Sequence, residues 1–516
     1  MLNCLYISST SACFELANDR PYYAPEAYTV LLNGERVREG DTNVFSLFGL
    51  KPDTEYEVSL SGGAEETLSF RTKSERCALD VKAFGAKGDG VTDDTVAIQT
   101  AIRFLPEGGR LHFPAGIYLT FPLALKSHIT LELAEGATLL GSTEREKYPI
   151  VPGTVPDLNG GEELHFAGFE GIAGAMYQSL ITAEYAEDIT LIGPGTVDGN
   201  AQNGDWWQKV NDLPAYRPRL CFFNRCKDIV MHGVHAQNSP SWQLHPYFSD
   251  HLAFYDVSVA APKVSPNTDA LDPESCDDVT IVGCKFTVGD DCVAIKSGKI
   301  ELGEKFNKSA DHHTIRNCLM AFGHGAVVLG SEIGAGVKNL SVSQCYFQGT
   351  DRGLRIKSRR GRGKNCIIDN VLFENIIMDG VLTPIVINLF YNCCDPDRFT
   401  EYVWSREHLP VDDRTPHMGR FHFKDMVCTG AQVAACYIDG LPESPIDEVE
   451  FENVSISFAE EAQSGVPAMQ NFAEKRCKLG LYLDNVRSIK VRDVKLDGVV
   501  GDKLIAGHYE TIDGGV

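Results

Sequence analysis

The chain has 516 residues, of which 43% are hydrophobic, enough for one extended solenoid or for more than one domain. Its formal net charge of −24 at pH 7 argues against nucleic acid as a partner, because a phosphate backbone needs a basic surface. No apolar run approaches the length of a membrane span, so no membrane partner is expected either.

The amino-terminal segment and the cysteines bear on the compartment. Residues 1–9 lack a basic start followed by a long apolar core, so we expect no secretory signal. The 16 cysteines follow neither a disulfide-framework spacing nor a zinc-site spacing. We interpret them as small core residues in a reducing compartment, and we expect a cytoplasmic protein that needs no metal or organic cofactor.

Residues 1–75 contain short strands separated by turn residues. Asn33-Gly34 follows a strand-like run at 28–32 and is a strong hairpin signal. The stretch from Gly49 to Tyr56 resembles the segment that leads into the tyrosine corner of fibronectin type III domains, where a tyrosine hydroxyl ties a strand to its loop. We therefore predict a fibronectin type III-like β-sandwich over 1–75 and a second domain over 76–516.

A short helix is predicted at the start of the second domain. Apolar residues recur at helical spacing from 97 to 102, and Thr92 or Asp93 is suited to cap the helix. An uncovered solenoid end would expose strand edges and core. We therefore expect this segment to cover the end of a coil, and its Asp93-Asp94 pair to cap rather than catalyse.

Strand-like runs then recur at intervals of about 22 to 40 residues. They lie at 129–133, 189–192, 229–232, 252–255, 279–282, 314–316, 340–342, 366–368, 449–451 and 489–491. Irregular repeats of this length, with several short strands each, are typical of a parallel β-helix whose insertions leave through the turns. A β-propeller is the alternative, but its blades would have a more constant period and more hairpins.

Three segments interrupt this rhythm, at 143–185, 300–311 and 392–418. Long loops inside a compact solenoid are usually functional or disordered, and we expect these three to wall off a cleft. Aromatic residues upstream of the cleft, namely Trp206, Trp207 and Trp242, could stack on sugar rings. Loop packing is the alternative for the first two.

Four polar clusters lie between residues 267 and 357. They are Asn267-Thr268-Asp269, Gly289-Asp290-Asp291, Gly323-His324-Gly325 and Arg355-Ile356-Lys357. Their spacing of about one repeat or slightly more would stack them side by side in a coil. Glycosidic hydrolysis needs a protonated acid and an ionised base, which three carboxylates can supply. Like charges so close favour keeping one of them protonated.

Cations crowd the last of these clusters and the residues after it. Arg355 and Lys357 are predicted to bind a carboxylate, since a local basic patch is what an acidic sugar would need in so acidic a protein. The cations from Arg359 to Lys364 are predicted to form a solvated loop.

In order and spacing, the four clusters resemble the signature motifs of the polygalacturonases, glycoside hydrolase family 28, from about residue 77 onward. The resemblance implies a right-handed parallel β-helix that hydrolyses pectic polysaccharides with inversion. It implies that Asp290 is the general acid, that Asp269 and Asp291 activate water, and that His324 supports the acid. Ala270 stands where many members have Gly, which bears on the local turn and not on the chemistry.

The resemblance also guides the substrate-binding set. We assign Arg355, Lys357, Asn267 and Lys296 to the oligogalacturonide substrate, together with His245 and Trp242, which precede the first motif. A satisfied structural histidine is the alternative for His245. Inversion predicts about 6.5–9.5 Å between Asp290 and Asp269 or Asp291.

We expect exo action, because an amino-terminal sandwich in front of the catalytic domain resembles the layout of bacterial exopolygalacturonases. The alternatives are a rhamnogalacturonan or xylogalacturonan hydrolase of the same family, of which the former generally lacks the histidine motif. Others are a calcium-dependent pectate lyase and a non-catalytic carbohydrate-binding solenoid. The sequence makes no prediction of the oligomeric state.

Overall fold

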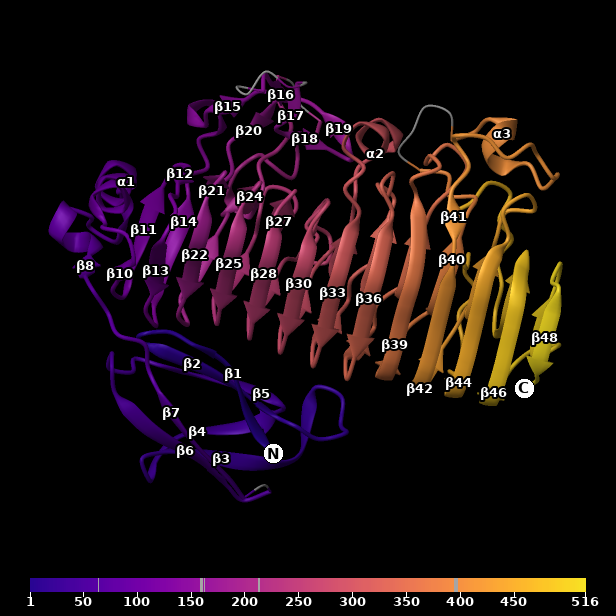
Figure 1. Ribbon diagram of the computed structural model, residues 1–516, viewed down its shortest axis with the longest axis horizontal. Coiled ribbons are helices and arrows are strands. Elements are labelled where there is room, and N and C mark those ends of the chain that lie inside the picture. The colour runs from indigo at the N-terminus through magenta and orange to yellow at the C-terminus, as the bar shows by residue number, and fades with distance from the viewer. Residues whose placement is uncertain (64, 158–160, 162, 212–213, 394–397) are drawn as a thin grey trace.

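The structure is a computed structural model that describes all residues except 64, 158–160, 162, 212–213 and 394–397. Its main body is a parallel β-helix, in which strands from successive coils stack along one axis (Figure 1). A small antiparallel β-sandwich, formed by the N-terminal residues, lies against one side of this helix. The predicted fold class is confirmed, and the β-propeller alternative is wrong because neighbouring coils pair in parallel.

The long sheet runs the length of the β-helix. In the described residues its strands are β8 (Ala78–Asp80), β9 (Asp89–Asp93), β10 (Gly109–Phe113), β11 (Gly116–Thr120), β13 (Ile129–Leu133), β14 (Ala137–Gly141), β22 (Glu187–Ile192), β23 (Thr196–Asp198), β25 (Lys227–His232), β26 (His235–Gln237), β28 (Asp250–Tyr255), β29 (Ser258–Ala260), β30 (Asp277–Val282), β31 (Lys285–Thr287), β33 (Ala310–Arg316), β34 (Leu319–Ala321), β36 (Val337–Ser343), β37 (Tyr346–Gln348), β39 (Ile367–Asp379), β41 (His417–Met418), β42 (Arg420–Ala431), β44 (Ile446–Phe458), β46 (Val486–Asp497) and β48 (Thr511–Gly514). Every strand-like run predicted from the sequence falls in this sheet, with 366–368 beginning one residue early.

A second sheet, called here the site sheet, runs beside the long one. Its strands are β12 (Leu123–Ala124), β21 (Ile181–Glu184), β24 (Cys221–Asn224), β27 (Leu244–Tyr247), β32 (Val293–Ile295), β35 (Val327–Gly330), β38 (Arg352–Lys357), β40 (Thr383–Asn388), β43 (Ala434–Asp439), β45 (Leu479–Asp484) and β47 (Leu504–Ala506). Leu271 pairs with both Leu244 and Val293 and so joins β27 to β32.

One hydrophobic core fills the inside of the coils. A single inward position can be followed by register across the long sheet, through Leu111, Leu131, Leu191, Met231, Phe254, Ile281, Ile315, Val342, Phe373, Phe423, Phe451 and Val491. None of these side chains is more than 2% exposed. Burying each contributes about 1.5–3 kcal/mol, and a slip of one residue would turn the whole row outward.

Many coils turn at a residue with left-handed backbone. Asp228, His251, Asp278, His312 and Asn339 follow paired positions on successive strands and have φ between +50° and +56°. Asn, Asp and His tolerate this region better than most residues. The recurrence of these residue types therefore fixes where each coil bends.

Helix α1 (Thr95–Phe104) covers the first coil, as predicted (Figure 1). It buries Ile98, Ala101 and Ile102 against the core. The cap residue differs from the expected Thr92 or Asp93: the helix begins after Asp94, whose carboxylate accepts backbone N–H groups of the preceding turn. The acidic pair is therefore structural.

The N-terminal sandwich consists of two antiparallel sheets. In the described residues these are β1 (Leu2–Ile7), β2 (Ser11–Leu16) and β5 (Val44–Phe48), facing β4 (Glu35–Thr42), β3 (Tyr23–Leu32), β6 (Glu55–Ser61) and β7 (Glu66–Arg71). The Lys51 backbone N–H donates to the Tyr56 hydroxyl over 2.9 Å, which ties that strand to its loop. Assignment to the fibronectin type III class stays a prediction, and the expected boundary at residue 75 lies between β7 and β8.

Polar contacts fix the sandwich to the long sheet over many coils. Glu15, which is 6% exposed, accepts two hydrogen bonds from Arg316, at 2.8 and 2.9 Å, and one from Asn317. Toward the N-terminal coils Thr10 donates to Glu132. Further along, the Gln344 side chain donates to the carbonyl of a sandwich residue, Asn18. The sandwich is therefore a fixed part of the molecule.

Two glycines of the long sheet make room for sandwich side chains. A Cβ placed on Gly233 would lie 2.1 Å from Phe48 Cζ, and one on Gly283 would lie 2.4 Å from Val44 Cγ1. Both glycines have positive φ, at +75° and +72°. The sequence therefore needs glycine there both for backbone conformation and for close approach.

Replacing Gly233 with Ala is expected to destabilise the protein by about 2–4 kcal/mol, the sum of left-handed strain and overpacking. Gly380 is a matched control, because its φ is +65° and no atom lies within 4 Å of its added Cβ. Calorimetric melting of the full chain should show a larger fall in Tm for Gly233→Ala than for Gly380→Ala. Equal falls in Tm for the two variants would mean that Phe48 moves aside without any loss of stability.

The three predicted insertions leave the coils on the side opposite the sandwich (Figure 1). The first contains η2 (Arg145–Lys147) and short paired strands, namely β15 (Ile150–Val151) with β20 (Met176–Tyr177), β16 (Thr154–Val155) with β17 (Leu164–His165), and β18 (Gly168–Phe169) with β19 (Ile172–Ala173). The second forms α2 (Ile300–Phe306), and the third contains α3 (Glu401–Trp404). Residues 158–160, 162 and 394–397 of these insertions lie outside the described part.

In the described part of the chain, no helix is long and apolar enough to cross a membrane. The described cysteines are free, and most are buried. Cytoplasmic localisation stays a prediction.

Candidate functional site

The four motifs meet on the site sheet. Asp269 comes two residues before Leu271, and Asp291 two residues before β32. His324 precedes β35, while Arg355 and Lys357 lie within β38 and alternate with buried Ile356. Because these strands are neighbours in register, the side chains gather around the three acids. Ala270, where the sequence departs from the family pattern, is fully buried.

Glycines in the motifs allow close packing around the acids. A Cβ on Gly289 would lie 2.5 Å from the carbonyl oxygen of Pro262, so the chain before the Asp pair passes directly against the preceding loop. A Cβ on Gly325 would approach Val328 to 2.4 Å and would stand between Asp291 and Arg355. Gly325 therefore keeps open the space in which carboxylate and cation meet.

Asp291 is held ionised by two cations. Its side chain is 1% exposed, with Lys357 Nζ 2.7 Å from Oδ2 and Arg355 Nη1 3.4 Å from Oδ1. Burial alone would raise the pKa of this carboxyl, but Lys357 and Arg355 lower it to about 2. Both predicted substrate cations thus contact one of the motif carboxylates in this structure.

Asp269 has the opposite electrostatic setting. It is 3% exposed, and its Oδ1 has no hydrogen-bond partner in the described part of the chain. Burial, followed by the nearby Asp272 and Asp290, raises the pKa of Asp269 well above its ordinary value. The pKa values of Asp269 and Asp291 are therefore shifted in opposite directions.

Asp290 is the most accessible of the three motif acids, with a side chain that is 22% exposed. His324 Nδ1 lies 3.3 Å from Asp290 Oδ1, and the His324 backbone N–H donates to the Asp290 carbonyl. The hydrogen bond to Asp290 raises the pKa of His324, against the effect of partial burial. A ligand entering the cleft therefore meets Asp290 and His324 together.

The three carboxylates lie closer than inversion led us to expect. One oxygen each of Asp269, Asp290 and Asp291 lie within 4.8 Å of one another, against about 6.5–9.5 Å predicted. The acids come from adjacent coils of the site sheet. The spacing gives no support to the predicted stereochemistry.

Asn267 is held by an arginine that the motif analysis missed. Arg217 Nη2 donates to Asn267 Oδ1 over 2.6 Å, and Arg217 Nη1 donates to the carbonyls of Pro240 and Pro266. Asn267 has φ +54°, a region that Asn tolerates. Arg217 is 3% exposed, so a buried cation fixes the loop from below. The basic run Arg217-Pro218-Arg219 was the available signal.

Three predicted substrate-binding residues lie behind the open cleft. Lys296, His245 and Trp242 are each 3% exposed. Lys296 Nζ sits 4.5 Å from the Trp242 ring centroid and 3.4 Å from Glu332 Oε2, while His245 Nε2 lies 3.1 Å from Glu274 Oε2. Their contacts in this structure are with buried protein groups, so direct stacking of Trp242 on a sugar is not open to it.

The acidic partners of this buried group were not predicted. Burial raises the pKa of Asp272 to about 7 and that of Glu274 to about 8. Burial would also raise the pKa of Glu332, but Lys296 and Lys357 lower it to about 2. The sequence does contain a sign of these partners: Asp272 and Glu274 are two residues apart after the first motif, and residues at that spacing share a strand face.

A family model for glycosyl hydrolases family 28 matches residues 158–478, which contain all four motifs. The chain belongs to glycosyl hydrolase family 28. A model described as rhamnogalacturonase A/epimerase, pectate lyase-like, matches residues 78–143, where the β-helix begins. The protein is therefore a glycoside hydrolase, as predicted.

Relatives of this family 28 enzyme cover most of the chain. A probable polygalacturonase from Vitis vinifera is 31% identical over 408 residues, 77% of this chain and 78% of that protein. An endo-polygalacturonase from Pectobacterium carotovorum subsp. carotovorum is 31% identical, covering 58% of this chain and 72% of its own length. The family 28 exopolygalacturonase from Yersinia enterocolitica, at 19% identity, covers 99% of this chain and 98% of its own with a TM-score of 0.74, which shows a shared fold.

Two other predictions about this family 28 chain need correction. Trp206 is fully buried against Tyr148 and Tyr177, so the loop-packing alternative holds for it. Most of the cations after Lys357 do not form a solvated loop: Arg359, Arg360 and Arg362 are 3%, 1% and 2% exposed. Arg360 pairs with Glu443 and donates to the Ser405 carbonyl, which anchors the third insertion. Lys364 is exposed, as predicted.

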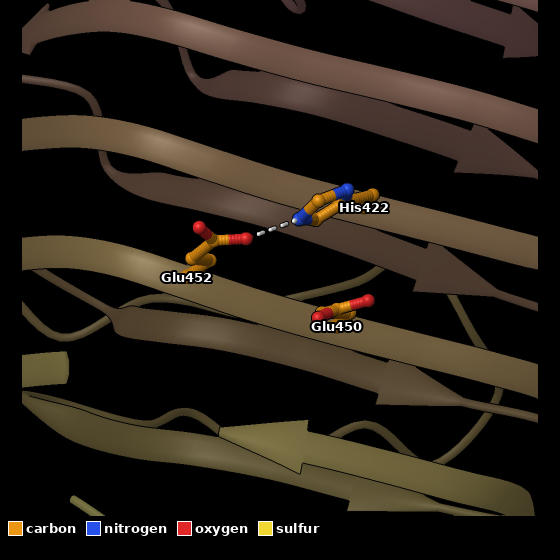
Figure 2. Close-up of side chains that lie close together, drawn as sticks. All are labelled: His422, Glu450 and Glu452. Carbon is orange, nitrogen blue, oxygen red and sulfur yellow. Dashed lines mark ion pairs between the residues drawn. The ribbon is translucent and has the colours of Figure 1, made fainter. Parts of the chain in front are cut away.

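Two clusters of metal-ligand type occur among the described residues. The first is Asp269, Asp290 and Asp291, called here the acid trio, where Lys357 and Arg355 already balance the charge of Asp291. The second, shown in Figure 2, is His422, Glu450 and Glu452 on β42 and β44. His422 Nε2 lies 3.3 Å from Glu452 Oε2, and Arg492 donates to Glu450, so both carboxylates already have protein groups beside them.

Proposed function

We propose that this family 28 hydrolase cleaves the α-1,4-galacturonosidic bonds of pectic oligogalacturonides, acting from chain ends. The observation that carries the proposal is the acid trio with its fixed cations. Asp290, accessible and joined to His324, donates a proton to the leaving oxygen. Asp291, which Lys357 and Arg355 hold ionised, is the base that deprotonates water, and Asp269, whose raised pKa favours its protonated form, positions the same water beside it.

Arg355 and Lys357 serve two purposes in this proposal. They hold Asp291 ionised, and a galacturonate carboxylate would bind to the donors that Asp291 leaves unused. Asn267 is exposed enough to contact the sugar. Lys296, His245 and Trp242 support this wall from behind.

Product analysis tests the reaction class. On trigalacturonate and polygalacturonate we expect new reducing ends and saturated products, with activity unaffected by a chelator. An ultraviolet-absorbing product lost on chelation would instead identify a calcium-dependent lyase, and cleavage confined to rhamnogalacturonan or xylogalacturonan would identify the other family activities. NMR of the first product should show an inverted anomer, and a retained anomer would overturn the assignment of Asp269 and Asp291 to water.

Two segments lie over the ends of the cleft and support exo action; they are the first insertion and the segment that contains Met469, and each is called here a cover. On one side the first insertion reaches the site sheet: Arg219 Nη2 donates to the Gly168 carbonyl over 2.7 Å, and a Cβ on Gly171 would lie 2.8 Å from the Lys299 backbone nitrogen. On the other side Met469 Sδ lies 2.9 Å from Arg355 Nη2. A pectic chain that cannot pass the first cover must enter the cleft by its end.

Exo action predicts galacturonate monomer or dimer from the first turnover, while a polygalacturonate solution loses viscosity slowly. Replacing residues 164–173 by a short Gly-Ser linker should remove the first cover and add internal cleavage, seen as intermediate oligomers and a faster fall in viscosity. Hydrolysis of trigalacturonate by the same variant is the internal control for an intact site. Early intermediate oligomers from the unaltered enzyme would contradict the proposal.

A further inference from the structure

A second cavity lies on the C-terminal coils, away from the acid trio. Its volume is about 680 Å³, within the range of about 300–1,000 Å³ typical of small-molecule sites. Arg406 of the third insertion, Tyr482 and Asp484 of β45, and His508 and Tyr509 of the C-terminal segment all line it. Three separate parts of the chain therefore converge on it.

Register places this cavity on the same sheet as the catalytic cleft but beyond one of its covers. Arg355, Val386, Tyr437 and Tyr482 occupy one paired position on β38, β40, β43 and β45. Three strand spacings amount to roughly 14 Å. Tyr437 between them is buried and is hydrogen-bonded to the side chain of Gln470, next to Met469, over 3.0 Å. The cover thus separates the two sites.

Aromatic rings form part of the cavity wall. Tyr482 stacks on Tyr437 with centroids 4.7 Å apart and planes at 13°, so one face of its ring is covered and fixed. The rest of Tyr482 borders the cavity, and Tyr509 is 47% exposed beside it. Such rings offer an apolar face next to a polar tip, which suits the alternating CH and OH groups of a sugar.

The charged groups of the wall are already balanced by protein partners. Arg406 Nη1 lies 2.6 Å from Asp439, and His508 Nδ1 lies 2.9 Å from Asp484. Arg487, which also lines the cavity, pairs with Asp447 at 3.1 Å. The wall therefore presents fixed hydrogen-bonding groups without an excess of positive charge, unlike the cleft at Arg355 and Lys357.

We propose that this cavity is a second carbohydrate-binding site, which takes a short neutral oligosaccharide. Aromatic faces with neutralised polar groups favour a polyhydroxylated, uncharged ligand over a uronate, whose carboxylate would need an unpaired cation. The site is independent of the hydrolytic reaction. It would hold an uncharged part of a polysaccharide while the acidic cleft works on another.

Calorimetric titration tests the site directly. Asp290→Asn protein is titrated with β-1,4-galactotetraose, xylotetraose, arabinotetraose and, as the acidic comparison, trigalacturonate. At least one neutral tetraose should bind, and it should bind equally well when the protein is saturated with trigalacturonate. No binding of any neutral tetraose, or competition with trigalacturonate for one site, would overturn the proposal, whatever the outcome for hydrolysis.

Variants locate the binding. Tyr509→Ala and, separately, Tyr482→Leu should each weaken the neutral tetraose about tenfold and leave trigalacturonate unchanged. Tyr185→Ala is the control, because Tyr185 is also exposed, at 58%, and does not line the cavity. Thermal melts confirm that each variant is folded. Unchanged neutral binding in both cavity variants would place the sugar elsewhere and overturn the assignment.

Discussion

Replacement of Asp290 by Asn should lower kcat on trigalacturonate by about 10²–10⁴-fold, the range expected when a positioned proton donor is removed. Asn matches the shape of Asp and can still accept the Asp291 backbone N–H, which Asp290 Oδ1 accepts at 3.0 Å. It cannot deliver a proton. KM should change little, because Arg355 and Lys357 on β38, which are proposed to bind the substrate, remain in place.

Asp278→Asn is the matched control for this variant. Asp278 is exposed, and its φ of +56° suits Asn as well as Asp. Steady-state kinetics and a thermal melt on both proteins separate loss of chemistry from loss of fold. More than a tenth of the original kcat in Asp290→Asn would mean that another group is the acid.

Lys357→Met should be the most damaging single change to the electrostatics of the cleft. It removes the cation 2.7 Å from a carboxylate that is 1% exposed. Leaving one partner of a buried pair alone costs about 3–5 kcal/mol, and we expect about 3 kcal/mol because Arg355 remains. Activity should fall by about 10²-fold, because Asp291 is no longer held ionised.

The pH dependence of this variant has a definite sign. In the unaltered protein Asp291 has a lowered pKa of about 2, so its ionised form contributes stability at neutral pH, which is lost as the pH falls through that value. Without Lys357, burial raises the pKa of Asp291. The gap in Tm between the two proteins should therefore be widest at neutral pH and narrow on acidification. Lys364→Met, at an exposed pair with Asp413, should show a small gap at every pH.

The repeat pattern and the motifs could be predicted from sequence because both are local. Inward residues such as Leu131 and Phe254 alternate at period two, and register carries that pattern from coil to coil. The motifs have fixed spacing along the chain, so coiling brings them together without knowledge of any loop.

The buried half of the site could not be predicted in this way. Whether Trp242 and His245 meet solvent depends on the first insertion, which places Phe169 against the Trp242 ring, with centroids 5.3 Å apart. Nothing in the local sequence says where an insertion folds back. For the same reason the sequence does not show that Arg360 is buried, since its partner Glu443 lies far along the chain.

The sandwich cross-links coils that are not neighbours in the β-helix. A solenoid without it would couple each coil only to its neighbours, and stability would add up pair by pair. Here Thr10 reaches Glu132 and Asn18 reaches Gln344, so one rigid body grips coils on both sides of the acid trio. Separating two coils between these points would also break their contacts with the sandwich. The sandwich therefore restrains changes in the distance between Asp269 and Lys357.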